Sequence, residues 1–179
     1  MTTTRDEQFR RYVLARRADL LRTATLLTAG DRHLAEDLVQ ATLTRLYLAW
    51  PAFQRAANPG GYARRALVNA LTDEHRRNWR RRERPMADLP ERPMPEITGP
   101  RSDELDEALA QLPPRMRAAL VFRYFHELNV AETALALGCA EGTVKSQTAR
   151  ALDRLRAVLE PDAATPVRAE SRVLAGASA

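Results

Sequence analysis

Residues 128–155, LNVAETALALGCAEGTVKSQTARALDRL, predict two helices separated by a sharp turn. Asn129 followed three residues later by Glu132 is the pattern of a capping box, which begins a helix. Gly138 supplies the break, because glycine adopts the left-handed backbone that ends helices at no steric cost. A second helix is expected to begin near Glu141. The stretch therefore predicts a helix-turn-helix.

The second of these helices has two chemically different faces. Its apolar side is expected to be buried, because the side chains recur at helical spacing: Val144, Thr148, Ala151, Leu152 and Leu155. Its opposite side carries hydrogen-bonding and cationic groups: Thr143, Ser146, Gln147, Arg150 and Arg154. Such groups can contact base edges and phosphates in the major groove. The helix is therefore predicted to read duplex DNA.

Composition favours an all-helical protein with a polyanionic partner. The chain has 179 residues, of which 45% are hydrophobic, and β-branched residues are sparse. Its net charge is +5 and its pI is near 10.1. One cysteine, Cys139, excludes an internal disulfide framework and fits a reducing cytoplasm. With a polar N-terminus and no apolar run near the roughly 18–20 residues that span a bilayer, we expect a cytoplasmic protein without a membrane partner.

The helical patterns divide into two small domains. Residues 5–84 predict helices over 7–27, over 32–50 and from Tyr62 onward, with a loop at 51–61. Residues 85–101 are rich in proline and predict an extended linker. Helices resume over 102–159, and residues 160–179 are expected to be disordered. Leu14 in the first domain and Leu135 in the second are expected to face a core.

Two exposed surfaces of the first domain are candidates for binding. The helix from Tyr62 to Arg84 carries eight arginines against three acidic residues, a charge of 8 − 3 = +5, which suits phosphate contacts. The alternative is a solvated basic face with Trp79 in the core. The helix over 32–50 gathers an acidic-polar patch, which favours protein docking over DNA binding: Glu36, Asp37, Gln40 and Thr44. An ordinary exposed helix face explains this patch equally well.

Four motifs make the chain resemble the extracytoplasmic-function (ECF) sigma factors of bacteria, and among them the actinobacterial SigE-like subgroup. They are AEDLVQATLTRLYLAW (35–50), NPGGYARRALVNALTDEHRR (58–77), LPPRMRAALVFRYF (112–125) and LGCAEGTVKSQTARAL (137–152). The last motif alone occurs in many helix-turn-helix regulators. All four in this order and spacing are specific to the family. The resemblance covers residues 5–159.

The resemblance implies that the two halves of the chain have different functions. Residues 5–84 would be sigma region two, and the acidic-polar patch would bind the clamp helices of the RNA polymerase β′ subunit. The −10 promoter element would be bound and held unpaired by Gln54, Asn58, Arg65, Asn69, Asp73, Arg76 and Arg80. Residues 102–159 would be region four, which touches the β flap. It would read the −35 element with Thr143, Lys145, Ser146, Gln147, Arg150 and Arg154.

The chain departs from the family pattern in two places. Ala140 stands where relatives place a serine cap before the recognition helix, and an alanine there costs roughly 0.5–2 kcal/mol of local stability. Gln147 and Thr148 replace a basic-aliphatic pair, and because glutamine prefers adenine edges the −35 preference is expected to differ. The seventeen-residue linker (101 − 85 + 1 = 17) can reach about 56 Å at ~3.3 Å per residue, enough to serve two separated promoter boxes.

Enzymatic, metal and cofactor functions find little support. His33, His75 and His126 lie far apart in the sequence, and Cys139 lies in a turn that needs a small apolar side chain. We therefore expect a non-enzymatic promoter-specificity subunit without a cofactor or small-molecule ligand. Its partners would be core RNA polymerase and promoter DNA, and whether an anti-sigma factor binds it stays open. The alternatives are a free-standing helix-turn-helix regulator and a nucleic-acid enzyme.

Overall fold

A computed structural model describes residues 4–82 and 103–159, with the side chains of 78–82 and 103 excepted. The expected linker (85–101), tail (160–179) and Arg80 side chain lie outside the described residues. The N-terminal half contains four helices: α1 (Arg5–Leu27), α2 (Arg32–Leu48), α3 (Trp50–Gln54) and α4 (Pro59–Arg82). The C-terminal half contains α5 (Asp103–Ala110), α6 (Pro114–Leu120), the π-helix η1 (Val121–Phe125), α7 (Val130–Leu137) and α8 (Glu141–Leu159). The all-helical class is confirmed, and no described residue lies in a strand.

Helix boundaries follow local capping chemistry. Thr4 caps α1 in a capping box with Glu7, and the Asp31 carboxylate accepts a hydrogen bond from the Leu34 amide to begin α2. The sequence-based loop at 51–61 is partly wrong. Pro51 lies in the first turn of α3, where its missing N–H is not needed, and α4 begins at Pro59 because Asn58 accepts from the Gly61 amide.

Two leucines expected in the core are exposed. Leu14 on α1 is 77% exposed and Leu135 on α7 is 69% exposed. The buried face of α7 consists of Thr133, Ala134 and Ala136, so Leu135 falls between them and points outward. On α1, Val13 packs against the core while its neighbour Leu14 does not. Hydrophobicity alone therefore does not show which of two neighbouring side chains on a helix is buried.

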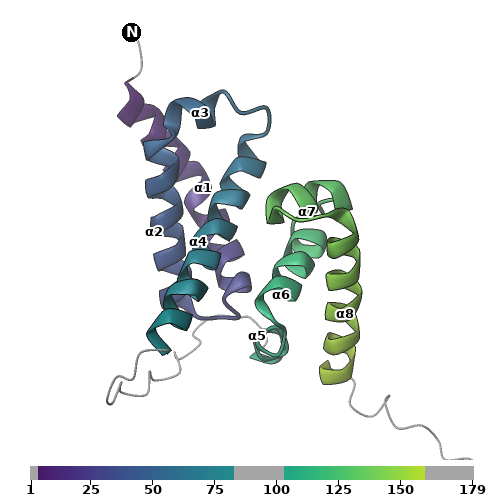
Figure 1. The fold of residues 1–179 in the computed structure, drawn as a ribbon. Coiled ribbons are helices and arrows are strands. Elements are labelled where there is room, and N and C mark those ends of the chain that lie inside the picture. The colour runs from purple at the N-terminus through teal and green to yellow at the C-terminus, as the bar shows by residue number, and fades with distance from the viewer. Residues whose placement is uncertain (1–3, 83–102, 160–179) are drawn as a thin grey trace, which may run out of the picture.

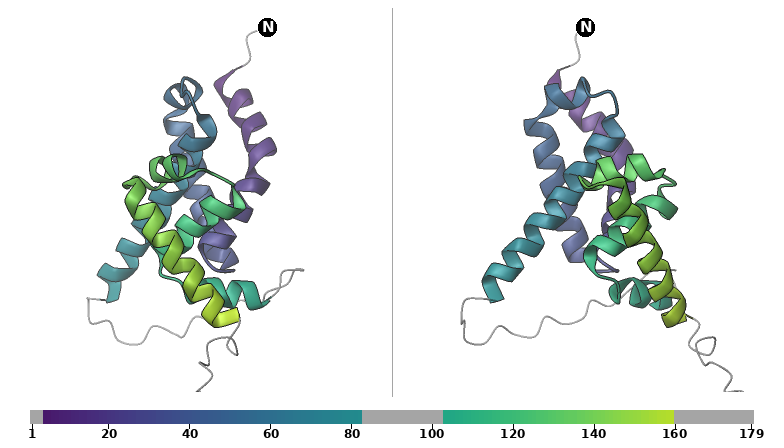
Figure 2. Two further views of the ribbon diagram at one scale, coloured as in Figure 1. Left: turned by 90° about the vertical axis from the view of Figure 1, so that its right-hand side faces the viewer. Right: turned by 45° about the vertical axis from the view of Figure 1, so that its right-hand side comes forward.

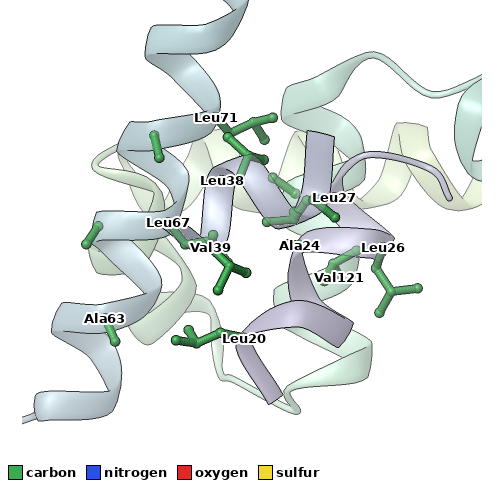
Figure 3. Close-up of a cluster of buried hydrophobic side chains, with 14 of the residues drawn as sticks. Leu20, Ala24, Leu26, Leu27, Leu38, Val39, Ala63, Leu67, Leu71 and Val121 are labelled. Atoms are coloured by element: carbon green, nitrogen blue, oxygen red, sulfur yellow. The ribbon is translucent and has the colours of Figure 1, made fainter. Parts of the chain in front are cut away.

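The two halves pack against each other and share one hydrophobic cluster (Figures 1 and 2). In Figure 3, Val121 of the C-terminal half lies with Ala24 and Leu26 of α1. The same cluster includes Leu67 on α4 and Leu109 on α5. None of the described helices is both long and apolar enough to span a membrane. The expected two helical domains are present, and they form one packed body.

Arg117 joins the ends of two helices, one from each half. Its side chain is buried, and its Nε donates to the Leu109 carbonyl at 2.8 Å while Nη2 donates to the Leu112 carbonyl at 2.9 Å. Its Nη1 donates to the carbonyl of Leu27, the last residue of α1, at 2.9 Å. Carbonyl groups in the last turn of a helix lack intrahelical partners. One guanidinium therefore caps α1 and the C-terminal end of α5 together.

Replacing Arg117 with alanine is expected to lower the free energy of unfolding by ~2–4 kcal/mol, because several buried carbonyl groups lose their donor. Arg115→Ala is the matched control, since Arg115 is exposed two residues away on α6. It should change stability by no more than ~0.5 kcal/mol. Urea denaturation of both variants measures the difference. Equal stability of the two variants would show that Arg117 does not hold these helix ends.

Candidate nucleic-acid interface

The helix-turn-helix lies where the sequence predicts it. Asn129 Oδ1 accepts from the Glu132 amide and Glu132 Oε2 accepts from the Asn129 amide, both at 2.9 Å, so the capping box is confirmed. Gly138 ends α7 with a φ of 64°, the left-handed region. The next helix, α8, begins at Glu141. The turn at Gly138 therefore sets the direction of α8 relative to α7.

One face of α8 is buried and the opposite face is open to solvent. Val144, Thr148 and Ala151 are buried, as expected. Five of the side chains expected to read the −35 element are exposed: Thr143, Lys145, Ser146, Arg150 and Arg154. Gln147 is half-buried, and its Oε1 atom is buried without a hydrogen-bond partner. A base can reach this oxygen only if the side chain rotates, so Gln147 is the least accessible of the six.

The side chains expected at the −10 element lie on α3, α4 and the turn between them, and several are held by other protein groups. The Gln54 amide donates to Gln8 Oε1 at 2.6 Å, and Asn58 caps α4. Arg65 donates to the carbonyl of Leu135 on α7 at 3.1 Å. The sequence signals the residue types but not these partners, most of which lie tens of residues away along the chain.

Further along α4, the expected −10 residues differ in their surroundings. Asn69 and Arg76 are exposed. Asp73 forms an ion pair with Arg45 of α2, with 2.5 Å between Oδ2 and Nη2. Both side chains of this pair are more than a third exposed, so solvent screens the attraction and the pair contributes little stability. The orientation of the Asp73 side chain is thus set by Arg45 of α2.

An aromatic cluster supports the turn that precedes α4. The rings pack edge-on or stacked with centroids 4.9–5.8 Å apart: Phe9, Tyr12, Tyr47, Trp50, Phe53 and Tyr62. Phe53 is 4% exposed and Tyr62 37% exposed, so Tyr62 alone of these two offers a ring to solvent. Aromatic pairs of this geometry stabilise beyond their buried area. The cluster therefore gives Gln54 and Asn58 a rigid base.

The acidic-polar patch on α2 is exposed along its whole length. Glu36, Asp37, Gln40 and Thr44 all face solvent. Leu48, which the sequence analysis did not single out, is 74% exposed and follows Gln40 and Thr44 at four-residue spacing. That spacing places an apolar side chain at the end of the same face. The four-residue spacing of Gln40, Thr44 and Leu48 is visible in the sequence, so the patch could have been extended to Leu48 from the sequence alone.

The described residues contain no group of three His, Cys, Asp or Glu side chains able to hold a metal ion. Cys139 is half-buried in the turn before α8. Burial raises the pKa of its thiol, which the positive charge of Arg115 opposes, so the nucleophilic thiolate is disfavoured at neutral pH. Burial also lowers the pKa of His126 and favours the neutral imidazole. These surroundings suit packing and hydrogen bonding.

Comparison with known proteins gives consistent matches over both halves. The family model for sigma-70 region 2 matches residues 12–81, and that for sigma-70 region 4 matches residues 102–155. The RNA polymerase sigma-E factor of Streptomyces coelicolor is 38% identical over 154 residues, covering 83% of this chain and 84% of that protein. The ECF sigma factor SigM of Mycobacterium tuberculosis is 33% identical, covering 86% and 76%.

A solved structure shares the fold over nearly the whole described chain. It is the sigma factor RpoE from Bartonella quintana in complex with the anti-sigma factor NepR. The TM-score is 0.69 at 24% sequence identity, and the match covers 87% of this chain and 99% of that one. The arrangement of the helices is therefore that of a known fold.

The missing side-chain cap of α8 gives a test of the candidate DNA reader. The backbone amides of Thr143 and Val144 bond only to the carbonyl of Ala140, which is exposed and has room for a hydroxyl. Ala140→Ser is expected to raise the free energy of unfolding by ~0.5–2 kcal/mol, because its hydroxyl can accept from the amide of Gly142 or Thr143 in the first turn of α8. Ala157→Ser, in the exposed last turns of the same helix, should not stabilise. Thermal unfolding compares them, and equal melting temperatures would contradict the capping argument.

Proposed function

The chain belongs to the extracytoplasmic-function sigma factors of the sigma-70 family, and from this premise we propose which of its surfaces bind core RNA polymerase and which bind each promoter element. As a member, it is a subunit that directs promoter-specific initiation of transcription. The N-terminal half is region two and the C-terminal half is region four. It acts where core polymerase is found, in the cytoplasm.

The observation that carries the assignment is the opposite character of two exposed helix faces. The patch on α2 contains two carboxylates among its four side chains, whereas the exposed face of α8 contains two cations, Arg150 and Arg154. A carboxylate face repels DNA phosphates, so its partner is a protein surface. Core polymerase therefore docks on α2, through the clamp helices of its β′ subunit, and the −35 element lies against α8.

Polymerase docking uses Glu36, Asp37, Gln40 and Thr44, and Leu48 extends the contact with an apolar side chain. Buried charged and polar groups at such an interface give specificity, while an exposed leucine beside them gives apolar area to bury. The region-four half contacts the β flap in the same assembly. Region two then binds the −10 element and region four binds the −35 element, each with its own surface.

The −10 element is bound by the turn before α4 and by α4 itself. Gln54 and Asn58 lie on or near this turn, while Arg65, Asn69, Asp73, Arg76 and Arg80 follow along the helix. Arginines neutralise phosphates, and a base held out of the stack offsets part of the cost of melting, a few kcal/mol per base. Asp73 lies on the same helix, and its carboxylate pairs with Arg45 of α2.

The −35 element is read by Thr143, Lys145, Ser146, Gln147, Arg150 and Arg154. Arg150 is the best placed for a base contact, because it is exposed near the middle of α8. An anti-sigma factor is a further expected partner, as NepR is for the Bartonella quintana protein. We assign the chain no catalytic role, and core polymerase carries out synthesis of the transcript.

Pull-down with core polymerase followed by run-off transcription tests the function as a whole. Transcripts from a chosen promoter should appear only when polymerase and this chain are combined. The competing function, a regulator that binds operators by itself, predicts full-strength duplex binding without polymerase. That outcome would overturn the sigma-factor proposal.

Replacing Asp37 with arginine is expected to weaken polymerase binding by ~2–5 kcal/mol, because it places a cation where a carboxylate meets the partner. Glu107→Arg on α5 makes the same change of charge at another exposed position and should bind normally. Binding curves with immobilised core polymerase compare the two. Normal assembly by the Asp37 variant would remove α2 as the docking surface.

Replacing Arg150 with alanine is expected to cost ~1–3 kcal/mol of promoter affinity and to relax preference at one base pair of the −35 element. Arg156→Ala, which lies on another side of α8, should leave that preference intact. Holoenzyme binding to promoters with single −35 substitutions measures both variants. A uniform loss over all sequences would make Arg150 a phosphate contact instead.

A further inference from the structure

Helix α1 carries positive charge that its own acidic residues do not neutralise. It contains six arginines and three acidic residues, a charge of 6 − 3 = +3. All three carboxylates are engaged within the protein, by the Tyr47 hydroxyl, by the capping box and by Arg22. Four of the arginines are exposed, and no described residue forms a hydrogen bond or ion pair with them: Arg10, Arg11, Arg16 and Arg17. This charge is therefore available to a polyanion outside the protein.

One side of α1 is continuous with the turn that is assigned to the −10 element. The Gln54 amide at the end of α3 donates to Gln8 Oε1 at 2.6 Å. The ring of Tyr12 packs edge-on against Phe53, with their centroids 4.9 Å apart. Figure 1 shows α3 beside the N-terminal half of α1. A ligand that lies on the turn therefore reaches α1 without crossing another helix.

Two of the four arginines lie on this side of α1. Arg11 follows Gln8 by three residues and Arg16 follows Tyr12 by four, and side chains at these spacings are neighbours on a helix surface. Burial raises the pKa of the Tyr12 phenol, and the positive charge of Arg16 opposes this rise, which shows that the two side chains are close. The two guanidiniums thus extend the surface of the turn along α1.

The extent of this face is limited by region four and by the other side of the helix. Thr23, seven residues after Arg16, has its Oγ1 2.9 Å from Nε2 of His126, so the contact with region four begins there. Arg10 and Arg17 share a different face, because they lie roughly 150° around the helix from Tyr12 at ~100° per residue. They therefore have the same chemistry as Arg11 and Arg16 but point away from the turn.

On the proposed function, this face lies at the downstream end of the −10 element. Residues 83–102 connect the C-terminal end of α4 to region four, which is assigned the upstream −35 element. That end of α4 is thereby assigned to the upstream end of the −10 element, and the turn at Gln54 and Asn58 to its downstream end. An unpaired strand that continues past the turn meets α1 next to Gln8.

We propose that Arg11 and Arg16 bind phosphates of the unpaired strand immediately downstream of the −10 element. The inference rests on the proposed function of the turn and α4, whose surface it extends onto α1. The contact is independent of base sequence, because guanidinium groups recognise phosphate oxygens. A protein partner fits less well, since Leu14, the exposed leucine of α1, lies on another side and this face has no large exposed apolar side chain to bury.

Forked promoter DNA tests the proposal with the assembled holoenzyme. The promoter is identified by sequencing the transcripts that appear on overexpression. Two forks share a duplex −35 element and a single-stranded −10 non-template strand; the short fork ends at the −10 element and the long fork continues for six nucleotides. Between Gln8 and Arg16 the helix rises about 12 Å at ~1.5 Å per residue, which six nucleotides cover at ~3.4 Å each.

The test variant is Arg11→Gln/Arg16→Gln, and Arg10→Gln/Arg17→Gln is the matched control with the same loss of charge from α1. Holoenzyme with the test variant should bind the long fork about fivefold more weakly than native holoenzyme at low salt, and its slope of log affinity against log salt should be shallower by about 1.4, ~0.7 per lost phosphate contact. The control should match the native chain, and all three should bind the short fork equally. Replacing every base of the extension with thymine should leave these differences unchanged.

Equal binding of the long fork by the two double variants would overturn the proposal, and so would an equal loss on both forks. Weaker binding of the test variant to core polymerase, measured by pull-down before DNA is added, would assign this face to a protein and also overturn it. These outcomes leave the sigma function standing as long as native holoenzyme transcribes from the promoter. Absence of that transcription would instead overturn the proposed function.

A photo-cross-link locates the strand independently of affinity. Ala15 is exposed between Arg11 and Arg16, so Ala15→Cys labelled with a benzophenone places the probe on the proposed path. A Cys139→Ser background removes the one native thiol. Leu14→Cys in the same background is the control, because Leu14 is exposed on another side of α1. The Ala15 probe should react with the added nucleotides of the long fork and the Leu14 probe should not. Equal yields from the two positions would contradict the proposed path.

Discussion

The buried guanidinium of Arg117 is the contact on which both the fold of region four and its packing on region two depend. Its donors satisfy carbonyl groups at the end of α5 and in the following turn, and one of them reaches the last residue of α1. A guanidinium suits this position because it presents five N–H groups in a fixed plane and stays charged. Burial lowers the pKa of Arg117, yet a guanidinium is basic enough to remain protonated in a protein. Helix α6 is thereby held to two helix ends together.

Much of the fold was predictable because the decisive signals are local. The Asn129–Glu132 capping box, the left-handed Gly138 and the buried stripe of α8 all involve residues close in sequence, and all are confirmed. The short helix α3 was missed because Pro51 was interpreted as a stop, although proline is equally compatible with a first turn. Leu14 and Leu135 were misplaced because hydrophobicity alone does not say which of two neighbouring side chains meets a partner helix.

The packing of the two regions was not predictable from periodicity. A pattern of apolar residues shows that a helix has a face to bury but not what covers it. Val68 illustrates this, because its partners are 54 or more positions away in the sequence (122 − 68 = 54). The proposed site residues were assigned by type and motif, but the hydrogen bonds of Gln54 and Arg65 to distant groups could not be predicted that way. On the proposed assignment, these side chains exchange protein partners for nucleic acid when DNA binds.

The dual attachment of Arg117 has a consequence for how such a protein can diverge. The guanidinium of Arg117 bonds to α5 within region four and also to the end of α1. A substitution that changes the contact with α1 therefore also changes the stability of region four. Thr23 offers a separate route, since its hydroxyl keeps a partner in its own helix when the link to His126 is lost. Evolutionary adjustment of the packing between the two regions should therefore occur at positions like Thr23, because Arg117 is needed both inside region four and at the contact with α1.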